Sequence, residues 1–407
     1  MANPYSFTQI ATILNTIVAG AQGRNANPLD TPVDTSQFVA LAQRGLTCGS
    51  DALTRSMTAL IARTIFSIRP YMGGITLLEA DDVDWGFVVR KLTPIVDPDS
   101  AQENPEQQDS PKNGESVDQW KMKLPQTLET SFTSAVQWCV QGPSIHTNAM
   151  RMSLRGPAEY GQWLGSQFTA TQNLINQQKT ALGHGTVCNF AGAKIAAANA
   201  DNSPVHVVHC LTEYNTLTGK ALTATTVFQP ENFADFVGWL CARIQTASDL
   251  MSRNLTVMHH QQAGGESAGK LLRITPKADQ RMLFYAPFEN MIQKMVLPWT
   301  FNENFLKLVP HDSLDYWQDV KQGAGINVTP TMLNSEGSAV KGAAVSAPYM
   351  LGVLYDRWAM GYSIVNDGDG VEMTPINARG RYYNIFWHFW RRYWNDTTEN
   401  GVVFLLD

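Results

Sequence analysis

Charge, basic surface and long apolar runs are all scarce in this chain of 407 residues. Only 16% of the residues are charged, against about 25% in an average soluble protein, and the net charge is −6. A protein that reads DNA or RNA sequence needs a basic surface, so the composition argues against that class. No apolar run reaches the ~18 residues of a membrane span, and residues 7–20 lack the basic start of a signal peptide. We therefore expect a soluble, non-secreted protein with no membrane partner.

Metal-binding and disulfide patterns are also missing. The five cysteines, at positions 48, 139, 188, 210 and 241, lack the paired spacing of a zinc site, and their odd number argues against a disulfide framework. We expect buried, reduced thiols. His206 and His209 are three apart in an expected strand and should point to opposite faces. Residues 366–370 (NDGDG) miss the spacing of a calcium loop and are expected to form a tight turn. No metal site and no cofactor is expected.

Apolar and aromatic residues are abundant, at 44% and 10% of the sequence. Because interface cores lose charge and gain aromatic side chains, this composition favours a protein that buries surface against partners. The aromatic residues are densest near the C-terminus, where eight of the thirteen residues 382–394 are aromatic. Their spacing predicts a strand with two apolar faces, one of which packs on the long helix that begins near Pro157. The other face is expected to be covered by another element or by a neighbouring subunit, and a strand buried wholly inside one subunit is the alternative.

Hydrophobic spacing predicts an α+β chain in which helices and strands do not alternate regularly. Helices are expected at residues 7–20, 36–46 and 50–68, from Pro157 to about 182 or beyond, from Pro230 onward, and at 287–295. Strands are expected at residues 85–92, 120–124, 128–140, 205–211, 221–228, 255–258, 281–285 and 350–355. Residues 381–394 and 401–406 are expected to form a strand pair joined by residues 395–400.

Residues 97–118 lie between two of the expected strands and have an unusual composition. They carry seven acidic residues and one lysine, and no apolar residue in them is larger than Val117. Such a segment cannot build a core of its own, so we expect the tip of a long hairpin.

Residues 264–270 (GGESAGK) match parts of two catalytic motifs. A phosphate-binding loop needs Ser or Thr at its eighth position, where this chain has Leu271, and a helix after it. A nucleophile elbow would centre on Ser267, but it needs a strand directly before and a helix directly after. We expect a flexible connector and assign no catalytic residue. A hydrolase that uses Ser267, or a nucleotide site at Lys270, is kept as the rival hypothesis.

Two segments resemble tailed-phage major capsid proteins of the Hong Kong 97-type fold. Residues 353–362 (VLYDRWAMGY) resemble the family's strand that ends in Asp and an Ala-hydrophobic-Gly turn. Residues 377–388 (NARGRYYNIFWH), with the later NGVVFL strand, are similar to a tract near the C-terminus of capsid proteins of small short-tailed phages. The order of the expected elements also resembles that family over essentially the whole chain.

This resemblance implies a domain organisation in four parts. Residues 1–78 would form an N-terminal arm with helices, and residues 79–138 an extended β-hairpin loop. Residues 139–200 and 362–407 would form a peripheral domain with a spine helix, and residues 201–361 an axial domain. The resemblance implies a shell subunit without enzymatic activity, located in the virion capsid and assembled in the cytoplasm of the host bacterium.

The partners are likewise implied by the resemblance. They are copies of the same chain in pentamers and hexamers, a portal protein, and packaged double-stranded DNA bound without sequence specificity. A separate scaffolding protein is expected, because only a short helix and an arm precede Ser36. An encapsulin-like nanocompartment subunit is the alternative with the same fold. The candidate residues for contacts between subunits are Trp85, Trp120, Lys121, Lys123, Arg379 and Arg381.

Overall fold

The computed structural model describes most of the helices and strands of the chain. The described residues are 7–22, 34–47, 75–79, 89–94, 127–132, 136–141, 144–146, 156–201, 205–253, 274–295, 310–333, 339–375 and 382–407, with the single positions 32, 148, 152 and 154. The helix predicted at 50–68 and the strands predicted at 120–124 and 255–258 lie outside these residues.

The described residues form a mixed α+β fold, as the sequence predicts. Its helices are α1 (Phe7–Gln22), α2 (Thr35–Thr47), α5 (Pro157–Asp201), α6 (Cys210–Thr218), α7 (Pro230–Met251) and α8 (Ala286–Met295), with 3-10 turns η1 (Thr76–Leu78) and η6 (Lys277–Asp279). The strands of the first half are β1 (Val89–Pro94), β2 (Thr127–Phe132), β3 (Val136–Gln141), β4 (Ile145–His146) and β5 (Val207–His209). Then follow β6 (Gln280–Tyr285), β7 (His311–Leu314), β8 (Ile326–Val328), β9 (Thr331–Leu333), β10 (Ala339–Lys341), β11 (Val345–Ala347), β12 (Met350–Asp356), β13 (Met360–Pro375), β14 (Tyr382–Asn395) and β15 (Gly401–Leu405).

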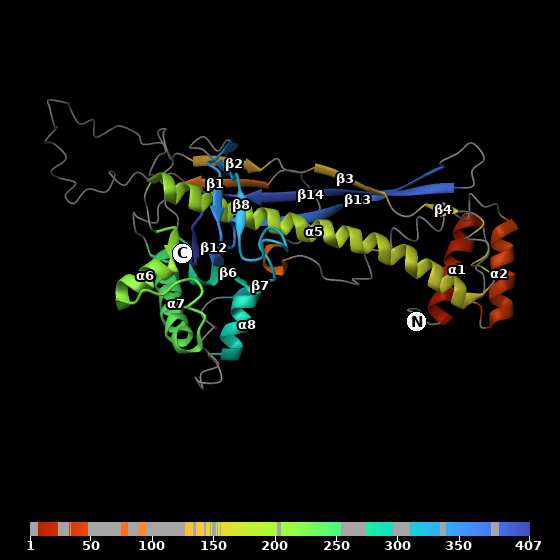
Figure 1. The fold of residues 1–407 in the computed structure, drawn as a ribbon. Helices are drawn as coiled ribbons and strands as arrows, with labels where there is room; N and C mark the ends of the chain where they lie inside the picture. The colour runs from red at the N-terminus through yellow and green to blue at the C-terminus, as the bar shows by residue number, and fades with distance from the viewer. Residues whose placement is uncertain are drawn as a thin grey trace, which may run out of the picture.

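Helix α5 is the longest element and gives the molecule its elongated shape (Figure 1). It has 45 residues, which at 1.5 Å per residue makes it about 68 Å long. Pro157 stands in its first turn, where the missing N–H costs nothing. Helices α1 and α2 pack at its N-terminal end, where the rings of Phe38 and Tyr160 are 6.3 Å apart. The predicted helix is therefore confirmed, and it continues almost twenty residues beyond 182.

Two sheets lie against this helix. In the first, β14 pairs with β13 on one side and with β3 and β4 on the other, all antiparallel, and the long β13–β14 hairpin runs along α5 (Figure 1). The second sheet has the order β5-β15-β12-β6-β7, antiparallel in the middle and parallel at both edges. Strands β14 and β15 belong to different sheets, so the predicted strand pair at the C-terminus is wrong. The loop that was expected to be a hairpin turn instead connects the two sheets.

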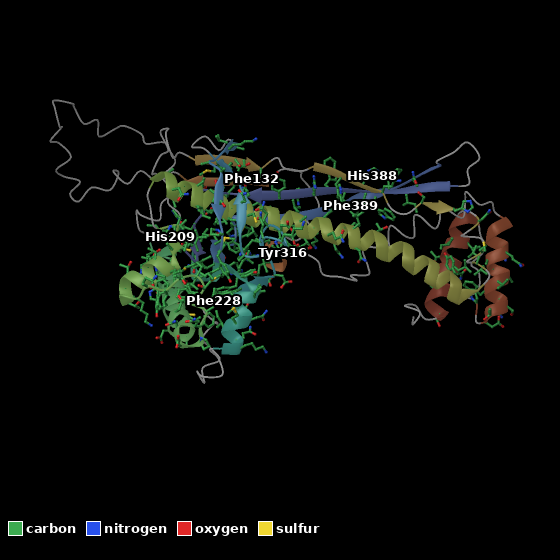
Figure 2. All side chains as sticks on the ribbon, in the orientation of Figure 1. Phe132, His209, Phe228, Tyr316, His388 and Phe389 are labelled. Carbon is green, nitrogen blue, oxygen red and sulfur yellow. The ribbon has the colours of Figure 1, made fainter. Side chains whose placement is uncertain are left out.

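The five-stranded sheet is buried on both faces, because helices cover each of them. All seven residues of β12 are buried, as expected for a central strand with an unbroken apolar run. One face packs on α6, α7 and α8, where Phe228, labelled in Figure 2, contacts the rings of Phe233 and Phe288. The apolar face predicted for the helix after Pro230 is confirmed. Its buried members are Phe233, Phe236, Val237, Leu240, Cys241 and Ile244.

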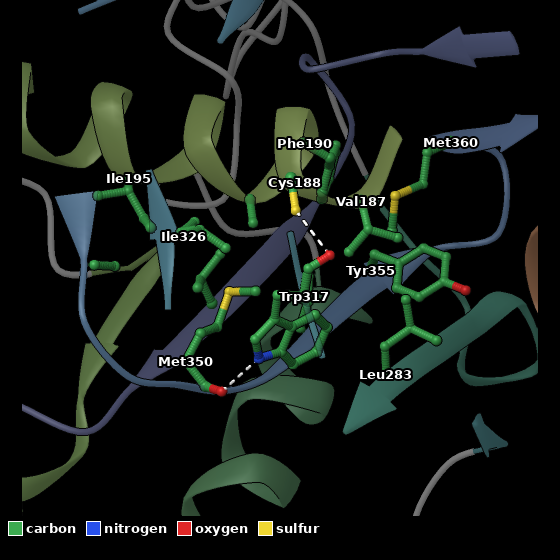
Figure 3. Close-up of a cluster of buried hydrophobic side chains, with 14 of the residues drawn as sticks. Val187, Cys188, Phe190, Ile195, Leu283, Trp317, Ile326, Met350, Tyr355 and Met360 are labelled. Carbon is green, nitrogen blue, oxygen red and sulfur yellow. Dashed lines mark hydrogen bonds between the residues drawn. The ribbon is translucent and has the colours of Figure 1, made fainter. Parts of the chain in front are cut away.

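The other face of this sheet packs on the C-terminal half of α5 around Trp317 (Figure 3). The Trp317 indole N–H donates to the carbonyl of Met350 at 2.7 Å. The Trp317 carbonyl accepts the Cys188 S–H at 3.3 Å and faces His184 Nδ1 at 2.9 Å. Burial lowers the pKa of His184, so the ring is neutral there. A connecting loop is thereby fixed to the helix and to the start of β12.

Four local predictions are wrong. The strand predicted at 128–140 is two strands, β2 and β3, which pair with β1 and β14 in different sheets. Of residues 205–211 only Val207–His209 forms a strand, and the helix α6 follows at once. Residues 221–228 form turns, because the hydroxyls of Thr223 and Thr226 bond to each other's backbone and compete with a ladder. Residues 366–370 are an irregular part of strand β13, with a register shift between Asn366 and Val371, and not a tight turn.

The aromatic strand β14 has one covered and one partly open face. Ile385, Trp387 and Phe389 are buried, whereas Phe386, His388 and Trp390 alternate with them and are half-buried. Figure 2 shows Phe389 on the side of the strand that faces α5 and His388 on the opposite side. The prediction that one face packs on the long helix is confirmed. On the open face, the exposed Cys139 of β3 lies opposite His388.

These two faces predict different outcomes for two tryptophans on β14. Trp387→Ala removes a ring that is 3% exposed and should lower the free energy of unfolding by ~3–5 kcal/mol, enough to abolish soluble expression. Trp390→Ala, on the half-buried face, should cost clearly less and leave a folded, soluble protein, with Tyr393→Ala, at 41% exposed, as the control for stability. Melting temperature and soluble yield check this. Equal melting of the Trp387 and Trp390 variants would contradict the assignment of the faces.

Candidate functional site: a buried polar junction between two sheets

Residues 396–400 connect the two sheets and form the most polar part of the protein interior. Asp396, Thr397, Thr398, Glu399 and Asn400 are consecutive, and none of them is more than 7% exposed. We call these five residues the junction loop. Asp, Thr and Asn favour turns because their side chains bond to nearby backbone, and Asp396 Oδ1 accepts both the N–H of Thr398 at 3.0 Å and its hydroxyl at 2.5 Å.

Lys91 of β1 reaches the junction loop from the base of the β1–β2 hairpin. Its Nζ lies 3.0 Å from Asp396 Oδ2 and also pairs with Glu399 Oε1. The lysine side chain is 23% exposed, whereas the two carboxylates are almost fully buried. Buried carboxylates need a cation and further hydrogen bonds to offset their loss of water, and Lys91 supplies the cation.

The side chain of Lys194 reaches the junction loop from α5 and is only 2% exposed. Its Nζ donates to the carbonyls of Thr397 at 3.0 Å and Glu399 at 2.5 Å, and lies 5.4 Å from the centre of the Phe190 ring. The next residue after the loop, Gly401, lies so close to α5 that a Cβ there would be 2.5 Å from the Phe190 ring. A glycine is therefore required for this approach of strand to helix.

The far end of the loop is tied to β12 through Asp356. The N–H of Asp356 donates to the Asn400 carbonyl at 3.2 Å, and Thr275 Oγ1 donates to Asp356 Oδ2 at 2.7 Å. Asn400 Nδ2 in turn donates to Thr275 Oγ1 at 3.3 Å. Burial, and secondarily the negative charge of Glu399, raise the pKa of Asp356.

Two further backbone contacts complete the junction. The N–H of Asp396 donates to the carbonyl of Ala359, in the turn between β12 and β13, at 2.6 Å. The N–H of Leu333 in β9 donates to Thr397 Oγ1 at 3.0 Å. The loop thus binds β1, α5, β9, the β12–β13 turn and the segment before β6, which fixes the relative position of both sheets.

The printed contacts of the junction carboxylates are structural. Asp396 and Glu399 pair with Lys91, and Asp356 accepts a hydrogen bond from Thr275. In the described ranges, no group of three or more His, Cys, Asp or Glu residues has a geometry that could hold a metal ion. The described helices include none long and apolar enough to cross a membrane.

A Ser, a Glu and a His do lie together on β7 and α8. The Ser313 hydroxyl donates to Glu289, and His311 Nε2 is 3.5 Å from the other oxygen of that carboxylate. The carboxylate therefore lies between the serine and the histidine, whereas a hydrolytic triad needs the histidine in the middle to take the serine proton. This order does not activate Ser313.

The two histidines of the 206–209 segment diverge, as predicted. His206 Nδ1 lies 3.0 Å from the carbonyl of Gly401, and burial lowers its pKa to about 3. His209 Nδ1 lies 2.8 Å from Asp407 on the surface. The prediction of buried thiols is confirmed for Cys188, Cys210 and Cys241, whereas Cys139 is exposed.

The six residues predicted to contact other subunits all lie outside the described residues. These are Trp85, Trp120, Lys121, Lys123, Arg379 and Arg381. The Gly-rich loop with Ser267 and Lys270 lies outside them as well.

Sequence reasoning missed the junction loop. A polar stretch between two apolar strands is typical of an exposed hairpin turn, and nothing local shows that it is buried. One signal was available. Lys194 is the single charged residue among small and apolar neighbours in residues 190–199, and a lysine in that setting needs a buried partner.

Comparisons with known proteins define the fold. No protein-family model and no curated protein matches the sequence. Among solved structures, a chain in the structure of head fiber and inner core protein gp22 of native bacteriophage P68 is 13% identical, with a TM-score of 0.51 over 84% of this chain and 86% of that chain. The capsid structure of Staphylococcus phage Andhra contains a chain that is 13% identical, with a TM-score of 0.49 over 84% and 86%. The capsid of Myoviridae phage XM1 gives 12% identity and a TM-score of 0.38 over 83% and 94%.

Of these three, the P68 chain exceeds a TM-score of 0.5. At 13% identity, this likeness shows the fold: the protein shares the overall α+β architecture of a chain in a bacteriophage structure.

The junction makes a testable prediction for Lys194. Lys194→Met keeps the length of the side chain but leaves the carbonyls of Thr397 and Glu399 without their donor, and each unsatisfied buried group costs about 1–3 kcal/mol. Lys179→Met is the matched control on the same helix, since Lys179 pairs with the half-exposed Glu79 and an exposed pair contributes at most ~1 kcal/mol. Denaturant unfolding of both variants checks the difference. Equal losses of stability would contradict the structural role given to Lys194.

Proposed function

We propose that the protein is the major capsid protein of a tailed double-stranded DNA phage, with the Hong Kong 97-type fold. The observation that carries the proposal is the likeness of 84% of the chain to a chain in the P68 structure. The sequence resemblance of residues 353–362 and 377–388 to capsid proteins supports it independently.

In this role the subunit has no enzymatic activity and assembles into pentamers and hexamers of an icosahedral shell. Its partners are other copies of the chain, a separate scaffolding protein, a portal protein, and packaged DNA that it encloses without reading sequence. A net charge of −6 suits loose contact with DNA phosphates, because a strongly basic inner surface would bind them tightly. The protein would be assembled in the host cytoplasm and reside in the virion.

The distribution of contacts supports an assembling subunit. A two-stranded sheet such as β1–β2 is marginal by itself in water, so it needs the body of the protein, which it reaches through Lys91 and the neighbouring β14. In the sequence, the acidic residues 97–118 lie between β1 and β2. We assign the six candidate residues on and near this hairpin and before β14 to contacts between subunits, and we propose the four-part domain organisation given above.

Assembly is the direct test of the proposal. Expressed with the scaffolding protein of the same phage, the subunit should form closed shells, or pentamers and hexamers, visible by negative-stain electron microscopy. Nuclease-resistant DNA inside particles from infected cells would favour the virus over an encapsulin-like compartment. A protein that stays monodisperse and monomeric under all scaffold and salt conditions would contradict the proposal.

Deleting residues 103–115 separates folding from assembly. The deletion removes the acidic tip without touching β1 or β2, so the melting temperature should stay within a few degrees of the parent while the yield of shells falls. The reason is that this segment has no large apolar residue with which to contribute to a core. Thermal unfolding and particle counts measure the two effects. A deletion that unfolds the monomer would show that the segment belongs to the core.

A further inference from the structure

Among the described side chains of the β1–β2 hairpin, Lys91 forms ion pairs with the rest of the subunit. Strands β1 and β2 pair only with each other, with Lys91 opposite Thr130. Thr130 is 3% exposed and Leu92, the next residue along β1, is 68% exposed. One face of the hairpin therefore points at the body of the subunit and the other at solvent, and Lys91 stands on the inner face.

The partners of Lys91 are parts of the junction loop and not of another surface element. Asp396 is fully buried and Glu399 is 7% exposed. The same loop binds Lys194 of α5 through the carbonyls of Thr397 and Glu399. A movement of the hairpin away from the body would therefore separate Lys91 from two carboxylates that have little access to water.

We propose that Lys91 is the positioning residue that sets the direction of the β1–β2 hairpin relative to the two sheets. Its ion pairs with Asp396 and Glu399 make the docked direction strongly preferred, because undocking breaks both pairs with carboxylates that have little access to water. With an uncharged side chain at position 91, the hairpin could change its direction relative to the two sheets without breaking an ion pair. The consequence for assembly rests on the proposed function, since a hairpin that reaches a neighbouring subunit must leave its own subunit in a defined direction.

The two lysines at the junction contact the loop in different ways. Lys194 points its ammonium at main-chain carbonyls of the loop, whereas Lys91 contacts the two carboxylates directly.

The test uses three variants of the full-length chain. Lys91→Met removes the charge and keeps the aliphatic stem, and Lys91→Arg keeps the charge. The triple variant Lys91→Met, Asp396→Asn, Glu399→Gln also removes the carboxylates that would otherwise be stranded, so it keeps the test valid where Lys91→Met alone fails to fold. Lys179→Met, which breaks the half-exposed pair with Glu79, is the control for loss of a lysine elsewhere.

Hydrogen exchange of the amides in residues 89–94 and 127–132 is the main readout, with residues of α7 as internal reference. In Lys91→Met, or in the triple variant, the hairpin amides should exchange at least tenfold faster than in the parent, while α7 is unchanged. Lys91→Arg and Lys179→Met should match the parent. Unchanged hairpin exchange in a folded variant without the lysine charge would overturn the proposal, as would equal acceleration in Lys179→Met.

Shell assembly is measured on the same proteins. It distinguishes a failure of the role proposed for Lys91 from a failure of the proposed capsid function. Faster hairpin exchange together with malformed or fewer shells supports both the role of Lys91 and its part in assembly. Faster exchange with normal shells supports the positioning role and overturns its importance for assembly. If the parent itself forms no shells, the proposed function fails, and the hydrogen-exchange result still decides the role of Lys91.

Discussion

The arrangement of this protein depends on five consecutive polar residues that are buried where its two sheets meet. The junction loop, residues 396–400, leaves the aromatic sheet at β14 and enters the five-stranded sheet at β15. Because a buried polar group must find a partner, the loop forms hydrogen bonds and ion pairs with several neighbouring elements. Those ties bring a hairpin, a long helix and both sheets to one place. The loop connects the two sheets at the place where these elements meet.

Much of the fold follows from local patterns that need no knowledge of the tertiary structure. The helix after Pro230 buries the residues that its spacing predicts, and β12 is buried throughout, as its unbroken apolar run indicates. Helix α5 begins at Pro157 because proline fits the first turn. The helix is longer than predicted because small residues near its C-terminal end obscure the apolar spacing from which a helix is predicted. Local patterns fail where hydrogen bonds of polar side chains decide the structure. Thr223 and Thr226 look like strand residues and instead bond to each other's backbone.

The junction shows the same limit more sharply. Lys91 and Glu399 are 308 residues apart, and Lys194 and Glu399 are 205 apart, so no spacing rule connects them. The loop has the composition of an exposed turn, and its burial is decided by β14 and β15 entering different sheets. The six residues proposed to contact other subunits, from Trp85 on the N-terminal side of β1 to Arg381 before β14, would be buried only by other copies of the chain. They were predicted from the family resemblance alone. The resemblance to phage capsid proteins agrees with the fold that the P68 likeness shows.

Native-state hydrogen exchange at the junction loop tests the central claim most directly. The amides of Asp396 and Glu399 donate to the carbonyls of Ala359 and Asp396, while the amide of Gln322 donates to Asp319 in a surface turn. If the loop holds the two sheets together, the first two amides exchange only when the whole subunit unfolds, at the rate of the amides in β12. Exchange of Asp396 and Glu399 as fast as that of Gln322 would show that the loop opens locally, and would contradict the account.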